Sequence, residues 1–199
     1  MRWWKSCMWI VLMACVCGKA DGRTLPGALE VSSSNVPEAQ TASPNVPNGF
    51  TGTFRYAGGA ADEEARKAAI DSAVKDMSFI IRSTARSRVM ETTQILDTYS
   101  FSFEPGKILV QPQSRPVMIS GSRGEPTQYS YKGKKSMMTQ VINGHRLTQT
   151  FVSDDGKREN EFTLSEDAQT LKLKVTLSSA RLSTPVTYVL PYRRVELGK

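Results

Sequence analysis

The feature that most constrains the fold is a two-residue alternation of apolar and polar side chains between Phe50 and Tyr192. This period is typical of β-strands that have one dry face and one solvated face. Lys172 and Lys174 mark the solvated face of one such run. The residues expected on the dry faces are Phe50, Gly52, Phe54 and Tyr56; Tyr99, Phe101 and Phe103; Ile108 and Val110; Val117 and Ile119; Tyr129 and Tyr131; Met137, Thr139 and Val141; Leu147, Gln149 and Phe151; Phe162 and Leu164; Leu171, Leu173, Val175 and Leu177; and Val186, Tyr188, Leu190 and Tyr192.

Short turns separate these runs, which indicates an antiparallel meander. Glu104–Lys107 contains Pro-Gly, Asn143-Gly144 is a strong two-residue hairpin signal, and Asp154–Gly156 is another. A meander of this length tends to close on itself, because closure removes exposed edges. The sequence therefore predicts a mainly β protein, an antiparallel up-and-down β-barrel of about 8–10 strands.

One strongly helical segment, 61–82, interrupts the strands after the first of them. Its apolar residues recur every three or four positions, as in an amphipathic helix. Asp62 is the expected N-cap. Two interpretations are open: the helix flanks or plugs the β-core, or it forms a lid over a ligand cavity. The residues of its apolar face are Ala65, Ala69, Ile70, Ala73, Val74, Met77, Ile80 and Ile81.

The first 20 residues have the pattern of an export signal. Arg2 and Lys5 precede the apolar run Cys7–Cys17, which is too short to span a bilayer, and small residues precede a cut after Ala20. Alternatively, Leu12–Cys15 resembles a bacterial lipobox, in which Cys15 would be lipidated and anchor the chain to a membrane. Both interpretations place the product outside the cytoplasm: in the periplasm, at the outer membrane or secreted.

Residues 21–48 are rich in Ser, Pro, Asn and Ala and are predicted to form a disordered linker. The barrel domain is therefore assigned to residues 49–199. All three cysteines lie before position 18, so the domain contains no intrachain disulfide. The formal charge of +7 would fall if 1–20 were removed, leaving 23 basic against 19 acidic residues. No basic stripe with interleaved aromatic residues is present, so we expect no nucleic-acid partner.

The sequence offers little for catalysis. The single histidine, His145, follows a hairpin turn, and Glu159 and Glu161 fall on a solvated strand face. A zinc site needs several converging ligands, and no nucleophile elbow or phosphate-binding glycine loop is present. We therefore expect no enzyme activity, no cofactor and no metal.

Arg82, Arg86 and Arg88 gather near the end of the helical segment. They are interpreted either as a solvated helix end or as a basic collar at the mouth of the barrel. Such a collar would attract an anionic head group or a phospholipid surface.

The order of strand, helical insert and long meander resembles the calycin superfamily (lipocalin-like and fatty-acid-binding-protein-like barrels). Phe50–Arg55, FTGTFR, is similar to the F-x-G-T-W-K first strand of the fatty-acid-binding arm, with Phe54 in place of Trp. Residues 143–151, NGHRLTQTF, are similar to its late hairpin. Tyr188–Arg194 resembles the closing strand, in which the resemblance implies that Arg and Tyr hold a ligand carboxylate.

The resulting hypothesis is an exported cell-envelope protein whose barrel binds a small hydrophobic or amphipathic ligand. Apolar walls with few polar groups suit such a pocket, and Arg82 and Arg86 would orient a polar head. The alternative is a non-catalytic structural or protein-interaction module of the bacterial envelope, its barrel filled by its own side chains. The residues expected to line the cavity are Phe54, Met77, Ile81, Phe101, Phe103, Phe151, Tyr188 and Tyr192.

Overall fold

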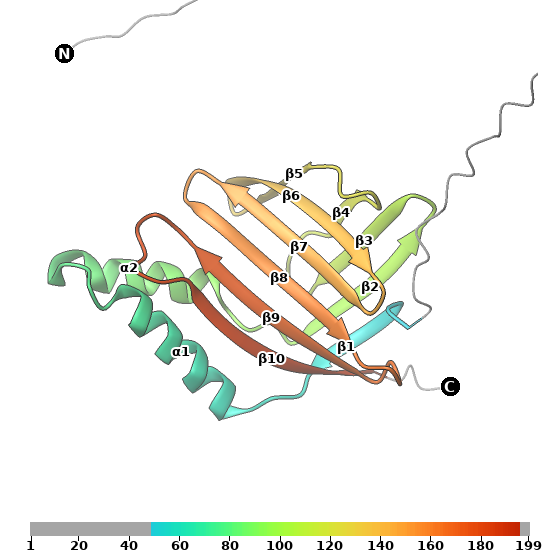
Figure 1. The fold of residues 1–199 in the computed structure, drawn as a ribbon, viewed down its shortest axis with the longest axis horizontal. Coiled ribbons are helices and arrows are strands. Elements are labelled where there is room, and N and C mark those ends of the chain that lie inside the picture. Colours follow the sequence, from blue (N-terminus) through green and yellow to red (C-terminus); the bar gives the residue numbers. More distant parts are fainter. Residues whose placement is uncertain (1–48, 196–199) are drawn as a thin grey trace, which may run out of the picture. The chain divides into compact units, whose positions relative to one another are not determined.

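The computed structural model describes residues 49–195, which form ten strands and two helices (Figure 1). Both helices follow the first strand, and the other nine strands follow the helices. The bounds are β1 Gly52–Tyr56, α1 Ala60–Val74, α2 Phe79–Thr92, β2 Thr98–Glu104, β3 Lys107–Pro112, β4 Met118–Gly121, β5 Thr127–Tyr131, β6 Lys134–Asn143, β7 Arg146–Ser153, β8 Gly156–Leu164, β9 Thr170–Ser178 and β10 Val186–Arg194.

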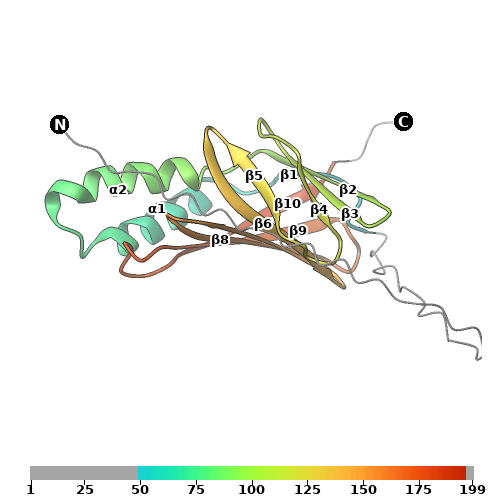
Figure 2. The same cartoon turned by 90° about the horizontal axis from the view of Figure 1, so that it is seen from above.

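The strands form one antiparallel sheet in the order β4-β3-β2-β1-β10-β9-β8-β7-β6-β5. Phe54 of β1 lies opposite Tyr99 of β2 and Arg194 of β10, so β1 joins the first and last parts of the meander. The sheet curls until its end strands, β4 and β5, approach each other (Figure 2). This arrangement confirms the predicted up-and-down barrel.

Across the gap between the two ends of the sheet, a side chain of β6 supplies hydrogen bonds in place of backbone pairing. The Gln140 amide on β6 donates to the carbonyl oxygens of Ile108 and Met118, at 3.2 and 3.3 Å, and to the Ser120 hydroxyl at 3.0 Å. Gln140 is fully buried. Gln149 on β7 also donates to Met118 Sδ at 3.4 Å, so buried amides of β6 and β7 link the nearly closed barrel across its gap.

The hairpin turns agree with the sequence, with one shift. Pro105-Gly106 and Asp154-Asp155 form the expected turns. In the β6–β7 hairpin Asn143 pairs with Arg146, so the turn is Gly144-His145 rather than Asn143-Gly144. Gly144 has φ +53°, which suits the first central position of a primed turn.

Two strands have the opposite phase to the one expected. On β4, Met118 and Ser120 are buried, whereas Ile119 is 41% exposed. On β6, Met138 and Gln140 face the interior, whereas the predicted Met137 and Val141 are 47% and 48% exposed. In each of these two strands, apolar residues occur on both alternating faces. Because a shift of one residue exchanges the two faces, the sequence pattern alone does not identify the inner one.

The predicted single helix is two helices. The first helix ends at Val74, although its C-cap Lys75 still has helical dihedrals, and Ser78 (ψ 146°) is the N-cap of α2. The N-cap of α1 is Gly59, not Asp62, whose carboxylate instead accepts a hydrogen bond from the Tyr56 hydroxyl at 2.8 Å. Burial and then this hydrogen bond raise the pKa of Tyr56 to about 12.

The sequence predicted that the apolar face of the whole segment 61–82 packs against the β-core, and in the structure α1 makes this contact. Ile70, Ala73 and Val74 are at most 1% exposed, and α1 packs against β10. None of the described helices is long and apolar enough to cross a bilayer. The assignments of 1–20 and 21–48, and with them Cys15, fall outside the described residues.

Candidate ligand site

The middle of the barrel is filled by its own aromatic side chains. Phe54 and Phe101 meet edge to face with ring centroids 5.8 Å apart, and Phe101 meets Phe162 at 5.2 Å. A water-sized void beside these side chains would leave part of them accessible, yet they are at most 2% exposed. Five of the predicted cavity residues therefore belong to the packed core: Phe54, Phe101, Phe151, Tyr188 and Tyr192.

The two buried tyrosines of β10 use their hydroxyls to hold the connection between α2 and β2. Tyr188 donates to the carbonyl oxygen of Thr93 at 3.0 Å, and Tyr192 donates to that of Leu96 at 2.9 Å. Burial raises the pKa of both phenols. These hydroxyls fix the connecting segment, instead of standing free for a ligand head group.

The other predicted site residues lie elsewhere. Phe103 is partly buried beside Phe50, and Met77 is partly buried in the α1–α2 turn. Ile81 is 55% exposed, so its expected inward placement is wrong. Arg82 donates to the carbonyl oxygen of Met77, and Arg86 pairs with Asp71 of α1. The structure thus does not bring the predicted set to one pocket, and its role in ligand binding stays a prediction.

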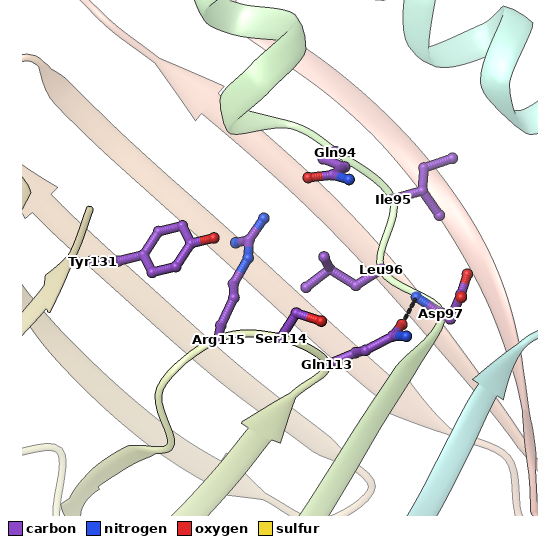
Figure 3. Close-up of a pocket in the computed structure, with 8 residues that line it drawn as sticks. All are labelled: Gln94, Ile95, Leu96, Asp97, Gln113, Ser114, Arg115 and Tyr131. Carbon is purple, nitrogen blue, oxygen red and sulfur yellow. Dashed lines mark hydrogen bonds between the residues drawn. The ribbon is translucent and has the colours of Figure 1, made fainter.

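A separate hollow of about 220 Å³ lies where the α2–β2 connection, the β3–β4 loop and β5 meet (Figure 3). Most of the residues that line it carry polar groups. They are Gln94, Ile95, Leu96, Asp97, Gln113, Ser114, Arg115 and Tyr131.

The walls of this hollow are held by hydrogen bonds. The backbone N–H of Asp97 donates to the Gln113 side chain at 3.1 Å, and Gln111 donates to the carbonyl oxygen of Arg115 at 2.7 Å. Ser114 has φ +56°, a left-handed conformation that is costly for a residue with a Cβ. The loop is therefore a fixed turn that presents Arg115 to the hollow.

Two guanidinium groups at this end of the barrel lack an acidic partner among residues 49–195. Arg115 lies 5.3 Å from the centre of the Tyr131 ring. Arg158 donates to the Asn160 side chain at 2.9 Å and to the carbonyl oxygen of Thr92. Neither forms an ion pair in the described part of the chain. A partly buried cation without a counter-charge favours an anion.

A buried hydroxyl completes this group. The Tyr129 hydroxyl on β5 is inaccessible and has no hydrogen-bond partner within the described residues. Burial raises its pKa, while the charges of Arg115 and Arg158 act in the opposite direction, so both cations lie within electrostatic reach of the phenol. An unmade buried hydrogen bond costs about 1–3 kcal/mol, and Tyr129 is not among the residues that line the hollow.

A row of buried polar side chains runs inward from Arg158, and of its members the sequence analysis placed only Gln149 on a dry face. The Asn160 amide donates to Gln149 at 3.2 Å, and the Gln149 amide donates to Gln140 at 2.7 Å. We call Arg158, Asn160, Gln149, Gln140 and Ser120 the polar ladder. The available signal was a polar residue at an apolar phase, as in Leu147-Thr148-Gln149-Thr150-Phe151.

No protein-family model matches the sequence, and comparison with curated proteins gives no match. Solved structures do match. A secretory abundant heat soluble protein from Ramazzottius varieornatus is 10% identical, with 74% of this chain and 96% of that chain covered, at a TM-score of 0.50. This match extends over nearly the whole of that protein.

The described domain has the calycin fold. A long meander with a helical insert after the first strand is the arrangement that the resemblance implied, and the insert here is two helices. Other matching structures include a Schistosoma mansoni fatty acid binding protein in complex with arachidonic acid (17% identity, 75% and 98% coverage, TM-score 0.46). A fatty acid-binding protein from Drosophila melanogaster brain also matches (14%, 72% and 98%, TM-score 0.45).

Within this calycin barrel, residues 49–195 contain no group of three or more acidic, His or Cys side chains that could hold a metal ion. His145 is exposed in its turn, Glu159 forms a surface ion pair with Lys157, and Glu161 forms one with Arg146. At the hollow itself, Arg115 supplies a positive charge and Tyr131 an aromatic ring.

Proposed function

We propose that this calycin domain binds one small amphipathic anion in the hollow beside Arg115. The single observation that carries the proposal is the Arg115 guanidinium, which has no acidic partner within residues 49–195 and lies beside the Tyr131 ring at an accessible hollow. A carboxylate or sulfonate head would accept hydrogen bonds from Arg115. Charge-assisted hydrogen bonds of this kind are among the stronger ones in proteins.

The size of the hollow limits the apolar part of the ligand. About 220 Å³ is below the ~300–1,000 Å³ of typical ligand pockets. A long acyl chain would have to displace core residues such as Phe101 and Phe162, which are nearly inaccessible. Leu96 and the Tyr131 ring supply the apolar wall that remains. We therefore infer a preference for short-chain or single-ring anions over long-chain fatty acids.

Replacing Arg115 with Gln is expected to weaken binding of salicylate, a fluorescent single-ring anion, by about ten-fold or more, because a charge-assisted hydrogen bond is lost. The measurement is a fluorescence titration of the full chain, with octanoate and palmitate as competitors. Octanoate is expected to displace the probe at lower concentration than palmitate.

The matched control is Arg193→Gln, which removes an exposed guanidinium from the outer face of β10. It should leave the affinity unchanged. An equal loss in both variants would mean that the probe senses net charge and not this hollow. No saturable binding by the unmodified chain would end the ligand proposal.

A second candidate function is a non-catalytic structural or protein-interaction module. The observation that favours it is the filled interior, in which Ile108, Leu147 and Val175 have no accessible surface. Small barrels are often filled in this way. Under both candidates the chain is not an enzyme, and the printed names of the matching structures, binding proteins among them, agree with this.

We further propose that the chain is exported to the cell envelope, with lipidation of Cys15 as the anchoring route. Support comes from the basic start, the short apolar run and the motif Leu12–Cys15. Expression of the full chain in a bacterium with radiolabelled palmitate should label the protein, and Cys15→Ser should abolish the label. Cys17→Ser is the matched control and should keep it. Labelling that survives Cys15→Ser would contradict lipidation at this residue.

A further inference from the structure

Three consecutive apolar side chains at the start of α2 are exposed. Phe79 is 87% accessible, Ile80 85% and Ile81 55%. Single exposed apolar residues are ordinary, but a contiguous apolar group marks an interaction site. We call Phe79, Ile80 and Ile81 the α2 tip.

The α2 tip projects away from the barrel. Figures 1 and 2 both show the α1–α2 turn at the end of the helices that points away from the strands. Val89 is the buried residue of α2, and Arg66 of α1 donates to Met90 and Thr93 near the far end of that helix. The attachment of α2 to the domain is thus at its C-terminal end, and the tip contributes little to the core.

Cations flank the α2 tip in the sequence. The segment 75–88 holds Lys75, Arg82, Arg86 and Arg88 against one carboxylate, Asp76. Arg86 is paired with Asp71, which lowers the pKa of that carboxyl. Lys75, Arg82 and Arg88 are exposed and form no ion pair within residues 49–195.

We propose that the α2 tip docks on an anionic lipid bilayer. Apolar side chains that project from a convex end, with basic residues behind them, suit the acyl boundary and the charged head groups together. A second copy of this chain fits less well, because two tips that meet would bring like charges together. The proposal is separate from the hollow at Arg115, which lies at the opposite end of α2.

The experiment places a solvatochromic dye on the tip of the full chain. Ile80→Cys is labelled in a chain whose Cys7, Cys15 and Cys17 are changed to Ser. The control label is at Val152→Cys, an apolar residue of the outer barrel face that is 50% exposed. The run 7–17 carries the same three changes to Ser in both labelled proteins. Vesicle binding through that run would therefore affect both labels alike.

With phosphatidylglycerol–phosphatidylcholine vesicles, the dye at position 80 should shift to the blue and the dye at 152 should not. Changing Arg82 and Arg88 to Gln should raise the lipid concentration at the midpoint by about thirty-fold, since each of the two surface cations contributes about 1 kcal/mol to anionic lipid binding. Phe79→Ser should raise it by a similar factor. Arg115→Gln should leave it unchanged.

Three results would overturn the proposal. The first is a dye at position 80 whose emission does not shift to the blue at saturating vesicle concentration. The second is an equal response to pure phosphatidylcholine, which would remove the role of the cations. The third is a shift without vesicles that grows with protein concentration, which would assign the tip to contacts between copies of this chain.

Discussion

Replacing Phe162 with Ala should lower the free energy of unfolding by about 3–5 kcal/mol, the usual cost of deleting a core phenyl ring. Phe162 has no accessible surface. Its ring meets those of Tyr99 and Phe101 edge to face, each with centroids 5.2 Å apart. Phe162 lies on β8 and the other two on β2, strands that are not neighbours in the sheet. The cluster therefore joins opposite walls, and the cavity left by Ala could not be closed by a small local shift.

The measurement is urea unfolding of the full chain, followed by circular dichroism. Phe79→Ala is the matched control: the same ring is deleted where it is 87% exposed, and the change should be below about 0.5 kcal/mol. If Phe162→Ala does not fold, Phe162→Leu replaces it. Leu keeps most of the side-chain volume and should lower the free energy of unfolding by less. Equal stabilities of the position 162 and position 79 variants would contradict the packed interior.

Most strands of this fold could be predicted because alternation and turns agree. In β9 and β10, apolar residues such as Leu173 and Tyr188 alternate with exposed Lys174 and Val189, and pairing fixes the register. In β4 and β6 the alternation has two apolar rows, so the pattern alone did not decide which row faces inward. Burial of Gln140 in place of Val141 reverses the simple rule, because Gln140 finds partners on two other strands.

The helical insert shows the limit of periodicity. Residues 61–82 fit one amphipathic helix, yet α1 ends at Val74 and the apolar Ile80 and Ile81 project into solvent. Periodicity identifies an apolar face, but not whether a partner lies opposite it. Ser78, a common N-cap residue, was the available signal for a second start.

The candidate site could not be predicted from the sequence for a related reason. Arg115 lies in the β3–β4 loop, Tyr131 on β5 and Gln94 in the α2–β2 connection, and they meet because the barrel brings these three parts together at one end. Tyr129 was predicted to face inward, but not to lack a hydrogen-bond partner. The resemblance led toward the closing strand, where the Tyr188 and Tyr192 hydroxyls proved to be bonded to the α2–β2 connection.

Replacing Gln140 with Leu should cost about 2–4 kcal/mol of unfolding free energy, since it leaves the Ser120 hydroxyl and the Gln149 amide without their shared partner. Gln128→Leu is the matched control, because Gln128 is exposed on the neighbouring strand β5. Its effect should be below about 0.5 kcal/mol. Hydrogen exchange should also become faster in β4, whose carbonyl at Met118 is bound to Gln140.

A double variant tests whether the polar ladder acts as a unit. Gln140→Leu leaves Gln149 buried with a weak sulfur acceptor, Met118 Sδ at 3.4 Å. Removing both amides takes away the unsatisfied group together with its partner, a change that can be nearly neutral. Gln140→Leu with Gln149→Leu should therefore lose less than the sum of the two single losses, by about 1 kcal/mol or more. Additive losses would mean that each amide is held independently, and that Gln140 alone links β6 to β4.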